Sequence, residues 1–199
     1  MGRLQSLRKA VSAYREGRIG DAAAYKAGLL QATPYPAVAE ALSRLETPLP
    51  AISLETLGAL EPGTLGRTYA DHMHRENLTP LDLSDEARRD LGEHVLGLRY
   101  TLLHDLFHVL LGFDTSWAGE LGVWEFVGAQ KYCPQYERAA RWSWRVYPLV
   151  APSQMSAFRA NSRRAKALAA NASCIIAHDF TESWSDPLDI VRADLGLRP

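Results

Sequence analysis

Three polar side chains lie within the most apolar stretch of the chain, and their types and spacing are those of a metal site. His104, Asp105 and His108 occur in the sequence TLLHDLFHVLLGF, whose other residues are nearly all large and apolar. Because residues three and four apart share one face of a helix, these side chains can converge on one point. A buried aspartate also needs a compensating cation. The spacing indicates a bound metal ion; the alternative is a His–Asp hydrogen-bond network without metal.

A fourth candidate ligand, Glu120, follows a predicted break between two helices. Gly112 is typical of a helix C-terminus, and residues 114–116 (Asp, Thr, Ser) are typical N-caps. On one straight helix Glu120 would lie roughly 18 Å beyond His108, whereas a reversal of the chain brings it back. Two imidazoles with carboxylates suit Zn²⁺, Fe²⁺ or Mn²⁺, and two histidines plus one carboxylate form the facial arrangement of non-haem iron oxygenases. The predicted metal and catalytic residues are His104, Asp105, His108 and Glu120.

The elements that must position these residues are all predicted to be helices. Apolar residues recur at helical spacing, and the chain has no period-two strand pattern. A helix ending near Lys131 carries Glu120, and a last helix follows Pro187. The other helices are expected at 3–18, 21–31, 36–46, 67–74, 84–97, 98–111, 135–147 and 153–177. The predicted fold class is all-α: one domain over 1–199, a multi-helix bundle with an apolar cavity beside a two-helix metal site.

Composition limits the partners and the cellular compartment that we expect for this protein. The chain of 199 residues has a net charge of −1, which gives no reason to expect nucleic acid as a partner. It contains no run of about 18 apolar residues and no signal-peptide pattern, so we expect no membrane span. Cys133 and Cys174 are too few for a disulfide framework. A reducing, cytoplasmic setting is the expectation.

Two further groups of residues have both a functional and a structural interpretation. Residues 3–18 predict a basic amphipathic helix that either lies on an anionic membrane surface or packs as an ordinary surface helix through its apolar stripe, the simpler interpretation. Arg163 and Lys166, in the Ala-rich helix 153–177, either contact lipid phosphate or belong to a solvated face. His72 and His74 are two apart and are expected to be exposed. The apolar stripe consists of Leu4, Leu7, Val11 and Tyr14.

The motif also resembles the signature of a known family. HDxxH followed by eleven residues and a glutamate, here His104, Asp105, His108 and Glu120, resembles the signature of the coenzyme Q biosynthesis protein 4 family. The segments PGTLGRTYADHM (62–73) and FTESWSDPLDIVRADLGL (180–197) are similar to family segments, so the family-like region covers about 55–197, after the N-terminal helices of 1–50.

The resemblance implies an all-helical protein of ubiquinone biosynthesis with a divalent metal on the four signature residues. It implies oxidative removal of the C1 carboxyl from a prenylated ring precursor, binding of isoprenoid lipid, and organisation of other ubiquinone-biosynthesis enzymes at the inner face of the membrane. A homodimer is left open. The residues expected to line the lipid or substrate pocket are Tyr69, Trp124, Arg163 and Lys166.

Two other functions remain open at this point. The chain could be a non-catalytic scaffold that binds isoprenoid lipid and holds a structural metal. It could also be a hydrolase like the HExxH zinc proteases, with Asp105 in place of the glutamate, although the shorter aspartate reaches less far towards a metal-bound water.

Overall fold

The computed structural model describes residues 2–46, 49 and 51–198, and within these residues every named regular element is helical. The all-α prediction is therefore confirmed. The α-helices are α1 (Arg3–Arg15), α2 (Ile19–Gly28), α3 (Pro36–Ser43), α4 (Leu54–Gly58), α5 (Leu65–Arg75), α6 (Asp85–Leu91), α7 (Val95–Leu111), α8 (Trp117–Ala129), α9 (Pro134–Val150), α10 (Met155–Asn171) and α11 (Leu188–Asp194). Short 3₁₀ turns lie at Gly92–His94, Pro152–Gln154 and Ile175–Ala177.

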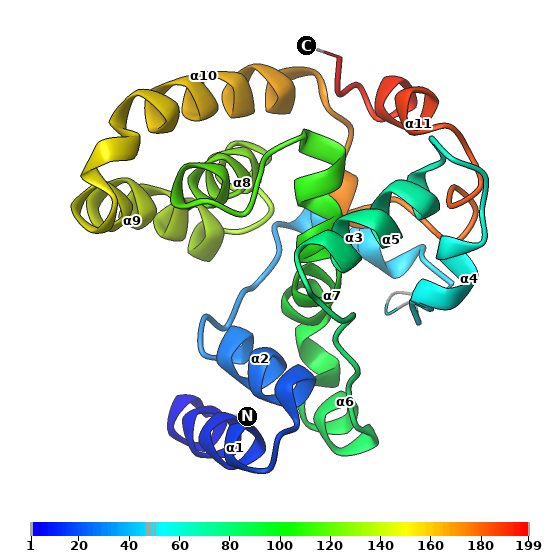
Figure 1. The fold of residues 1–199 in the computed structure, drawn as a ribbon. Helices are drawn as coiled ribbons and strands as arrows, with labels where there is room; N and C mark the ends of the chain where they lie inside the picture. Colours follow the sequence, from blue (N-terminus) through cyan, green and yellow to red (C-terminus); the bar gives the residue numbers. More distant parts are fainter. Residues whose placement is uncertain (1, 47–48, 50, 199) are drawn as a thin grey trace.

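Helix α7 is the centre of the arrangement (Figure 1). Helices α8, α9 and α10 form a group on one side of it, and α4, α5 and α11 lie on the other, while α1, α2 and α6 gather at its N-terminal end. Thirteen of the seventeen residues of α7 are buried. This explains why the helix is apolar all round in sequence, as expected for a helix covered on every side.

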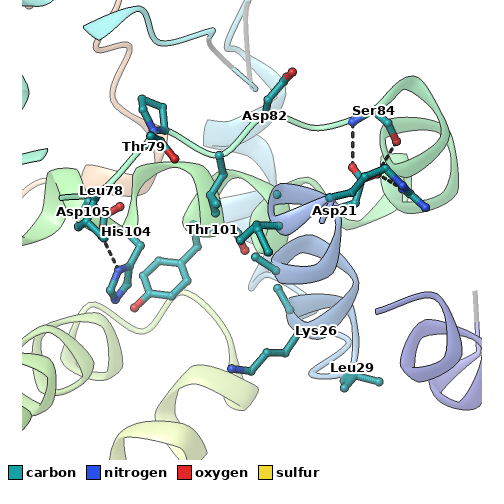
Figure 2. Close-up of a pocket in the computed structure, with 18 of the residues that line it drawn as sticks. Asp21, Lys26, Leu29, Leu78, Thr79, Asp82, Ser84, Thr101, His104 and Asp105 are labelled. Atoms are coloured by element: carbon teal, nitrogen blue, oxygen red, sulfur yellow. Dashed lines mark hydrogen bonds and ion pairs between the residues drawn. The ribbon is translucent and has the colours of Figure 1, made fainter. Parts of the chain in front are cut away.

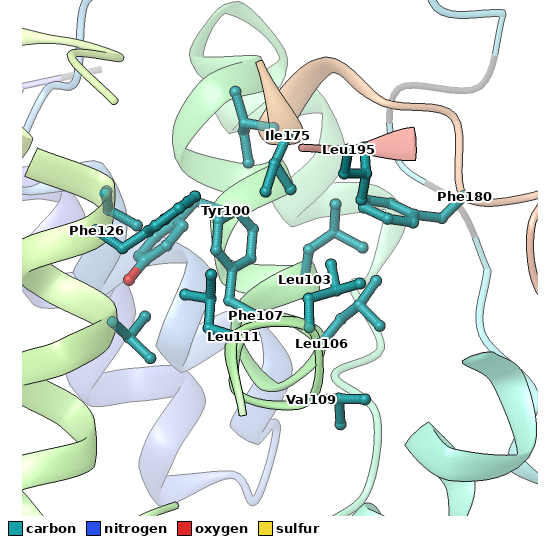
Figure 3. Packing of buried hydrophobic residues seen from close by; sticks show 14 of the residues in the cluster. Tyr100, Leu103, Leu106, Phe107, Val109, Leu111, Phe126, Ile175, Phe180 and Leu195 are labelled. Carbon is teal, nitrogen blue, oxygen red and sulfur yellow. The ribbon is translucent and has the colours of Figure 1, made fainter. Parts of the chain in front are cut away.

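The core around α7 is built from large apolar side chains of several helices (Figure 3). Leu103, Leu106 and Phe107 are fully buried, and Phe126 of α8 packs against the ring of Phe107 with centroids 6.3 Å apart. Ile175 and Phe180 complete this cluster from the segment before α11. The metal-motif helix is thus held by contacts from parts of the chain far apart in sequence.

Side-chain caps begin the helices where the sequence predicts them. Thr64, Ser84 and Ser116 accept a hydrogen bond from the backbone N–H three residues on, at the starts of α5, α6 and α8. Buried Asp21 of α2 accepts hydrogen bonds from the backbone N–H and the hydroxyl of Ser84, at 2.8 and 2.7 Å. This contact joins α2 to the start of α6.

Two arginines from the C-terminal part of the chain hold the end of α7. Arg164 of α10 donates hydrogen bonds to the carbonyls of Leu111 and Gly112, and Arg192 of α11 donates to those of Val109 and Leu110. The last carbonyls of a helix have no partner within it, and cations are favoured there. The helix end beside the candidate site is therefore fixed by α10 and α11 together.

Two expectations about exposure are wrong. The stripe on α1 does not pack against the protein: Leu4 is 77% and Tyr14 is 70% exposed, while small residues such as Ala13 make the buried contacts with α2. His72, expected on the surface, is only 5% exposed because it lies on the face of α5 that carries Leu65 and Tyr69; His74 is exposed as expected.

Candidate metal centre

The turn between α7 and α8 brings Glu120 back to the two histidines of α7. Gly112 adopts a left-handed conformation with φ of 64°, and the N–H of Phe113 bonds to the carbonyl of His108 at 3.2 Å, which ends α7. Ser116 then caps α8, so that Glu120 lies in the first turn of that helix. The predicted reversal at residues 112–116 is the local structure that makes the site.

Three ligand atoms meet in the resulting space. The Nε2 atom of His104 lies 3.4 Å from Oε2 of Glu120, and Nε2 of His108 lies 3.3 Å from Oε1 of the same carboxylate. One ligand atom from each of the three residues lies within 4.8 Å of the others. With metal–ligand bonds of about 2.0–2.2 Å, one ion can contact all three atoms after small adjustments.

Both imidazoles are oriented for Nε2 coordination. Nδ1 of His108 lies 3.3 Å from the carbonyl oxygen of Phe113, which only accepts, so we assign the proton to Nδ1. Nδ1 of His104 lies 3.2 Å from the carboxylate of Asp105, which favours the same tautomer. A hydrogen bond from the other ring nitrogen is the usual support of a metal-binding histidine.

Asp105 therefore takes a different position from the other three signature residues. Its carboxylate contacts Nδ1 of His104, on the side of the ring away from the Glu120 contact, and the residue is not in the three-ligand group. This geometry suits a residue that orients a ligand. A fourth, direct ligand role for Asp105 stays a prediction.

The buried Nε2 of His108, which has no hydrogen-bond partner, supports a metal in this place. Among the described residues, the buried side-chain atoms that lack a hydrogen bond are Nε2 of His108, Nε2 of His72 and the hydroxyl of Tyr100. The rings of His72 and His104 lie 6.3 and 4.9 Å from that of His108, and the ring of Tyr100 lies 5.7 Å from that of His104. Unpartnered buried groups are rare and often mark a bound ion or a catalytic site. The side chain of His108 is 0% exposed, so a cation is a better partner for its Nε2 than bulk water.

The charges of the metal-free site are strongly coupled. Burial opposes protonation of His104, but its hydrogen bonds with Asp105 and Glu120 outweigh burial and raise its pKa to about 9. Burial would raise the pKa of Glu120, but the contacts with His104 and His108 lower it to about 2. A proton on His104 thus compensates the carboxylates in the absence of a metal, and metal binding must displace it.

This coupling predicts how the stability of the metal-free protein depends on pH. Because the pKa of His104 rises from 6.5 to about 9 on folding, its contribution is full below pH 6.5 and is lost as the pH rises through 9. With a chelator present, we expect Tm to fall between these pH values and His104→Gln to flatten that fall. Thermal scans across this range measure it, with exposed His74→Gln as the control. An equal slope in wild type and His104→Gln would contradict the assignment.

His104 and Asp105 line a cleft of ≈ 1090 Å³. Figure 2 shows His104 and Asp105 at one end of this cleft and Asp21 with Ser84 at the other. The cleft lies between α2, the segment 77–84 and α7, and Tyr100, Trp124 and Tyr136 line it near His104. The ring of Tyr100 contacts those of Trp124 and Tyr136, with centroids 5.6 and 5.0 Å away, and so forms an aromatic wall.

The residues predicted to line a pocket lie in different places. Trp124 lines the cleft, whereas Tyr69, Arg163 and Lys166 are not among its described lining residues. Tyr69 is buried with its ring 5.8 Å from that of Trp184. Arg163 is exposed on α10, and the ammonium of Lys166 pairs with the carboxylate of Glu125 at 2.7 Å. Of these four residues, Trp124 is the one that lines the cleft with His104.

Sequence reasoning missed two contributions to the site. The burial of His72 could have been predicted from the sequence. Leu65, Tyr69, His72 and Met73 have the spacing of one helix face, and all four are buried. Arg75 lies 3.2 Å from Nδ1 of His72, so the proton of the neutral ring is at Nε2. The contribution of residues 17–30 to the cleft wall could not be predicted in this way, because the apolar residues of this segment are small or scattered.

The fold and the site define an all-helical protein with a candidate metal centre of two histidines and one carboxylate at the end of its central helix. The profile of the family described as Coenzyme Q (ubiquinone) biosynthesis protein Coq4 matches residues 45–199. The chain belongs to this family. The match begins after α3, so α1 and α2 lie outside it.

Named relatives agree with this membership, and a solved structure agrees with the fold. The Ubiquinone biosynthesis protein COQ4 homolog, mitochondrial, of Danio rerio is 29% identical over 163 residues, which cover 78% of this chain and 57% of that protein. The Rattus norvegicus homolog is 29% identical over 156 residues, covering 75% and 58%. The chain thus spans a little over half the length of these relatives. A crystal structure from Nostoc punctiforme, of a protein provisionally described as a ubiquinone biosynthesis protein, has a TM-score of 0.63 at 22% identity, covers 98% of this chain and 96% of that chain, and shows the fold alone.

Proposed function

We propose that this protein is a metal-dependent enzyme of ubiquinone biosynthesis that oxidatively removes the C1 carboxyl from a prenylated ring precursor. Membership of the Coq4 family supports the pathway. One structural observation supports the enzymatic part: His104 of the three-ligand group lines an open cleft, and the side chains of His104 and Glu120 are still 28% and 27% exposed. Structural metal sites are closed by four protein ligands, whereas catalytic sites keep an open position.

The residues around the centre have distinct roles in this proposal. His104, His108 and Glu120 would hold a divalent Zn, Fe or Mn ion, and Asp105 and the carbonyl of Phe113 orient the two imidazoles. The ion would supply Lewis acidity and, if redox-active, electron transfer to the oxidant that the reaction requires. The aromatic wall of Tyr100, Trp124 and Tyr136 contacts the substrate ring and excludes water.

The shape of the cleft fits a substrate with an apolar tail. Ring-sized ligands need only part of ≈ 1090 Å³, a volume at the upper end of sites for small molecules. The rest of the wall is mostly apolar and includes Ile19, Ala23, Ala27 and Leu81, while Leu78 lies at the end of the cleft beside Asp105 (Figure 2). An isoprenoid chain would bury its surface along this wall while the ring remains beside the metal ligands.

The test is replacement of Glu120 by Gln in a strain that lacks this quinone-biosynthesis step. We expect the folded Glu120→Gln protein to leave quinone formation below detection, because the amide removes the only carboxylate of the three-ligand group. Exposed Glu182→Gln makes the same chemical change elsewhere and should restore quinone fully. If Glu120→Gln restores quinone and still co-purifies with other pathway enzymes, the protein is a scaffold and the catalytic proposal fails.

A further inference from the structure

The hydroxyl of Tyr100 is a buried donor without a partner. Tyr100 is 6% exposed, and its hydroxyl makes no hydrogen bond with any described residue. Other buried phenols of the chain have partners. The hydroxyl of Tyr25 donates to the carboxylate of Asp90 at 2.8 Å, and that of Tyr132 donates to Oε1 of Gln130 at 3.2 Å. A buried polar group that lacks a partner lowers stability, so the hydroxyl of Tyr100 requires an explanation.

Tyr100 lies beside candidate ligands of both helices. It precedes His104 by four residues on α7, so the two side chains share a helix face, and their rings make an edge contact with centroids 5.7 Å apart. On α8, Trp124 follows Glu120 by the same spacing, and its ring lies 5.6 Å from that of Tyr100. The phenol therefore lies where the ligand-bearing faces of α7 and α8 meet.

The phenol of Tyr100 keeps its proton in this position. Burial raises the pKa of Tyr100 well above its usual value, with smaller contributions from neighbouring charges that include the carboxylate of Glu120. Tyr100 is therefore a hydrogen-bond donor at neutral pH. The carboxylate of Glu120 is also close enough to act on this hydroxyl electrostatically.

Loading of the centre with a metal would change the partners of Glu120. In the metal-free centre each oxygen of its carboxylate faces an imidazole: Oε2 lies 3.4 Å from Nε2 of His104, and Oε1 lies 3.3 Å from Nε2 of His108. Once both nitrogens are metal ligands, neither can carry a proton towards the carboxylate. A carboxylate that binds the ion through one oxygen is then left with a second oxygen that has no donor.

We propose that Tyr100 is the positioning residue of Glu120: in the metal-loaded protein its hydroxyl donates a hydrogen bond to the carboxylate oxygen of Glu120 that does not bind the ion. This inference rests on the metal centre of the proposed function, although not on its catalytic part. One bond then satisfies both the unpartnered donor and the acceptor that the histidines release. Carboxylates that bind metals are themselves held by hydrogen bonds from outer residues, which orient them and raise metal affinity.

This role completes the support of the centre. Two of the candidate ligands already have an outer partner, since Asp105 contacts Nδ1 of His104 and the carbonyl of Phe113 lies beside Nδ1 of His108. Glu120 is the third ligand, and Tyr100 gives it a partner of its own. The ring and the hydroxyl of Tyr100 thus have different tasks, because the ring lines the cleft while the hydroxyl is buried away from it.

The zinc affinity of Tyr100→Phe tests this role. The change removes the hydroxyl and keeps the ring of the aromatic wall. We expect the variant to bind Zn²⁺ about 10- to 100-fold more weakly than wild type, the usual cost of losing an outer partner of a metal ligand. Competition with a chromophoric chelator of known affinity measures both dissociation constants. Tyr14→Phe makes the same chemical change at a side chain of α1 that is 70% exposed, and it should bind Zn²⁺ like wild type.

Thermal unfolding without metal distinguishes this role from a structural one. The hydroxyl of Tyr100 has no partner to lose in the metal-free protein, so the Tm of metal-free Tyr100→Phe should not fall. Tyr132→Phe should give the opposite pattern. It loses the hydrogen bonds with Gln130 and with the N–H of Ile176, so its Tm should fall while its Zn²⁺ affinity stays at the wild-type value.

Infrared difference spectra between the zinc-loaded and the metal-free protein report on the carboxylate of Glu120 itself. In wild type we expect the widely separated antisymmetric and symmetric stretches of a carboxylate that binds through one oxygen. In Tyr100→Phe the separation should narrow, because the oxygen that has lost its donor turns to the ion.

Several results would overturn the proposal. Equal Zn²⁺ affinities for wild type and Tyr100→Phe, or an unchanged separation of the stretches, would do so. So would a Tm of metal-free Tyr100→Phe that falls as far as that of Tyr132→Phe, because the hydroxyl would then have a partner without metal. A wild-type protein that takes up no Zn²⁺ would overturn this proposal and the metal centre together. Restoration of quinone by Glu120→Gln, by contrast, would end the catalytic proposal and leave the role of Tyr100 standing.

Discussion

The protein in which His108 is replaced by alanine is expected to lose its bound metal. His108 supplies a fully buried Nε2 that faces the carboxylate of Glu120 and has no hydrogen-bond partner of its own. Changing a residue that only orients a ligand costs about 10- to 100-fold in metal affinity, so removing a ligand should cost more than 100-fold. Elemental analysis of protein purified without added metal should show about one ion per chain in wild type and almost none in the variant.

The control for this experiment is His74→Ala, because His74 is exposed on α5 and outside the three-ligand group. It should retain the wild-type metal content. His108→Ala protein with a full complement of metal would show that the ligands are elsewhere. The cavity left by the imidazole could destabilise the fold, and circular dichroism before the metal analysis establishes that the variant is folded.

Replacing Phe107 with alanine is expected to lower the free energy of unfolding by about 3–5 kcal/mol. Phe107 is 0% exposed, and its ring lies 5.8 Å from that of Tyr100 and 6.3 Å from that of Phe126. It therefore packs α7 against α8, the two helices that carry the metal ligands. Urea unfolding of the metal-free protein measures the change directly, without a contribution from metal binding.

Two further variants serve as comparisons for Phe107→Ala. Phe107→Leu keeps most of the apolar volume and should cost clearly less than the alanine change, and Ile190→Ala, at a side chain that is 51% exposed, should change stability by less than about 0.5 kcal/mol. A loss below about 1 kcal/mol for Phe107→Ala would mean that the α7–α8 contact is not a main part of the core.

The convergence of the three candidate ligands could be predicted because its signals are local. The i, i+4 pair of His104 and His108, the glycine that ends α7 and the serine that caps α8 are each readable within a few residues, and together they determine where Glu120 lies. Asp105 shows the limit of this reasoning. Spacing places it on the same helix but does not distinguish a direct ligand from a residue that holds the ring of His104.

The remaining differences between the predictions and the structure come from contacts between segments that are far apart in the sequence. His72 is buried because α5 packs against α7; its spacing from Leu65 and Tyr69 marks the buried face, but the pair of histidines at 72 and 74 alone does not. The stripe on α1 is exposed because α2 contacts the small residues on another side of that helix. Arg163 and Lys166 share a helix with many alanines, and only the packing of α10 on α8 decides which of its side chains turn outward.

The arginines that hold the end of α7 make the metal centre sensitive to damage far from it in sequence. Arg192 donates hydrogen bonds to the carbonyls of Val109 and Leu110, one and two residues beyond His108, although it lies more than 80 residues later in the sequence. A frameshift or proteolytic cut near residue 185 would leave those carbonyls unsatisfied at the turn that returns Glu120 to the histidines. Loss of α11 in a truncated variant would then resemble a mutation of the candidate metal ligands themselves.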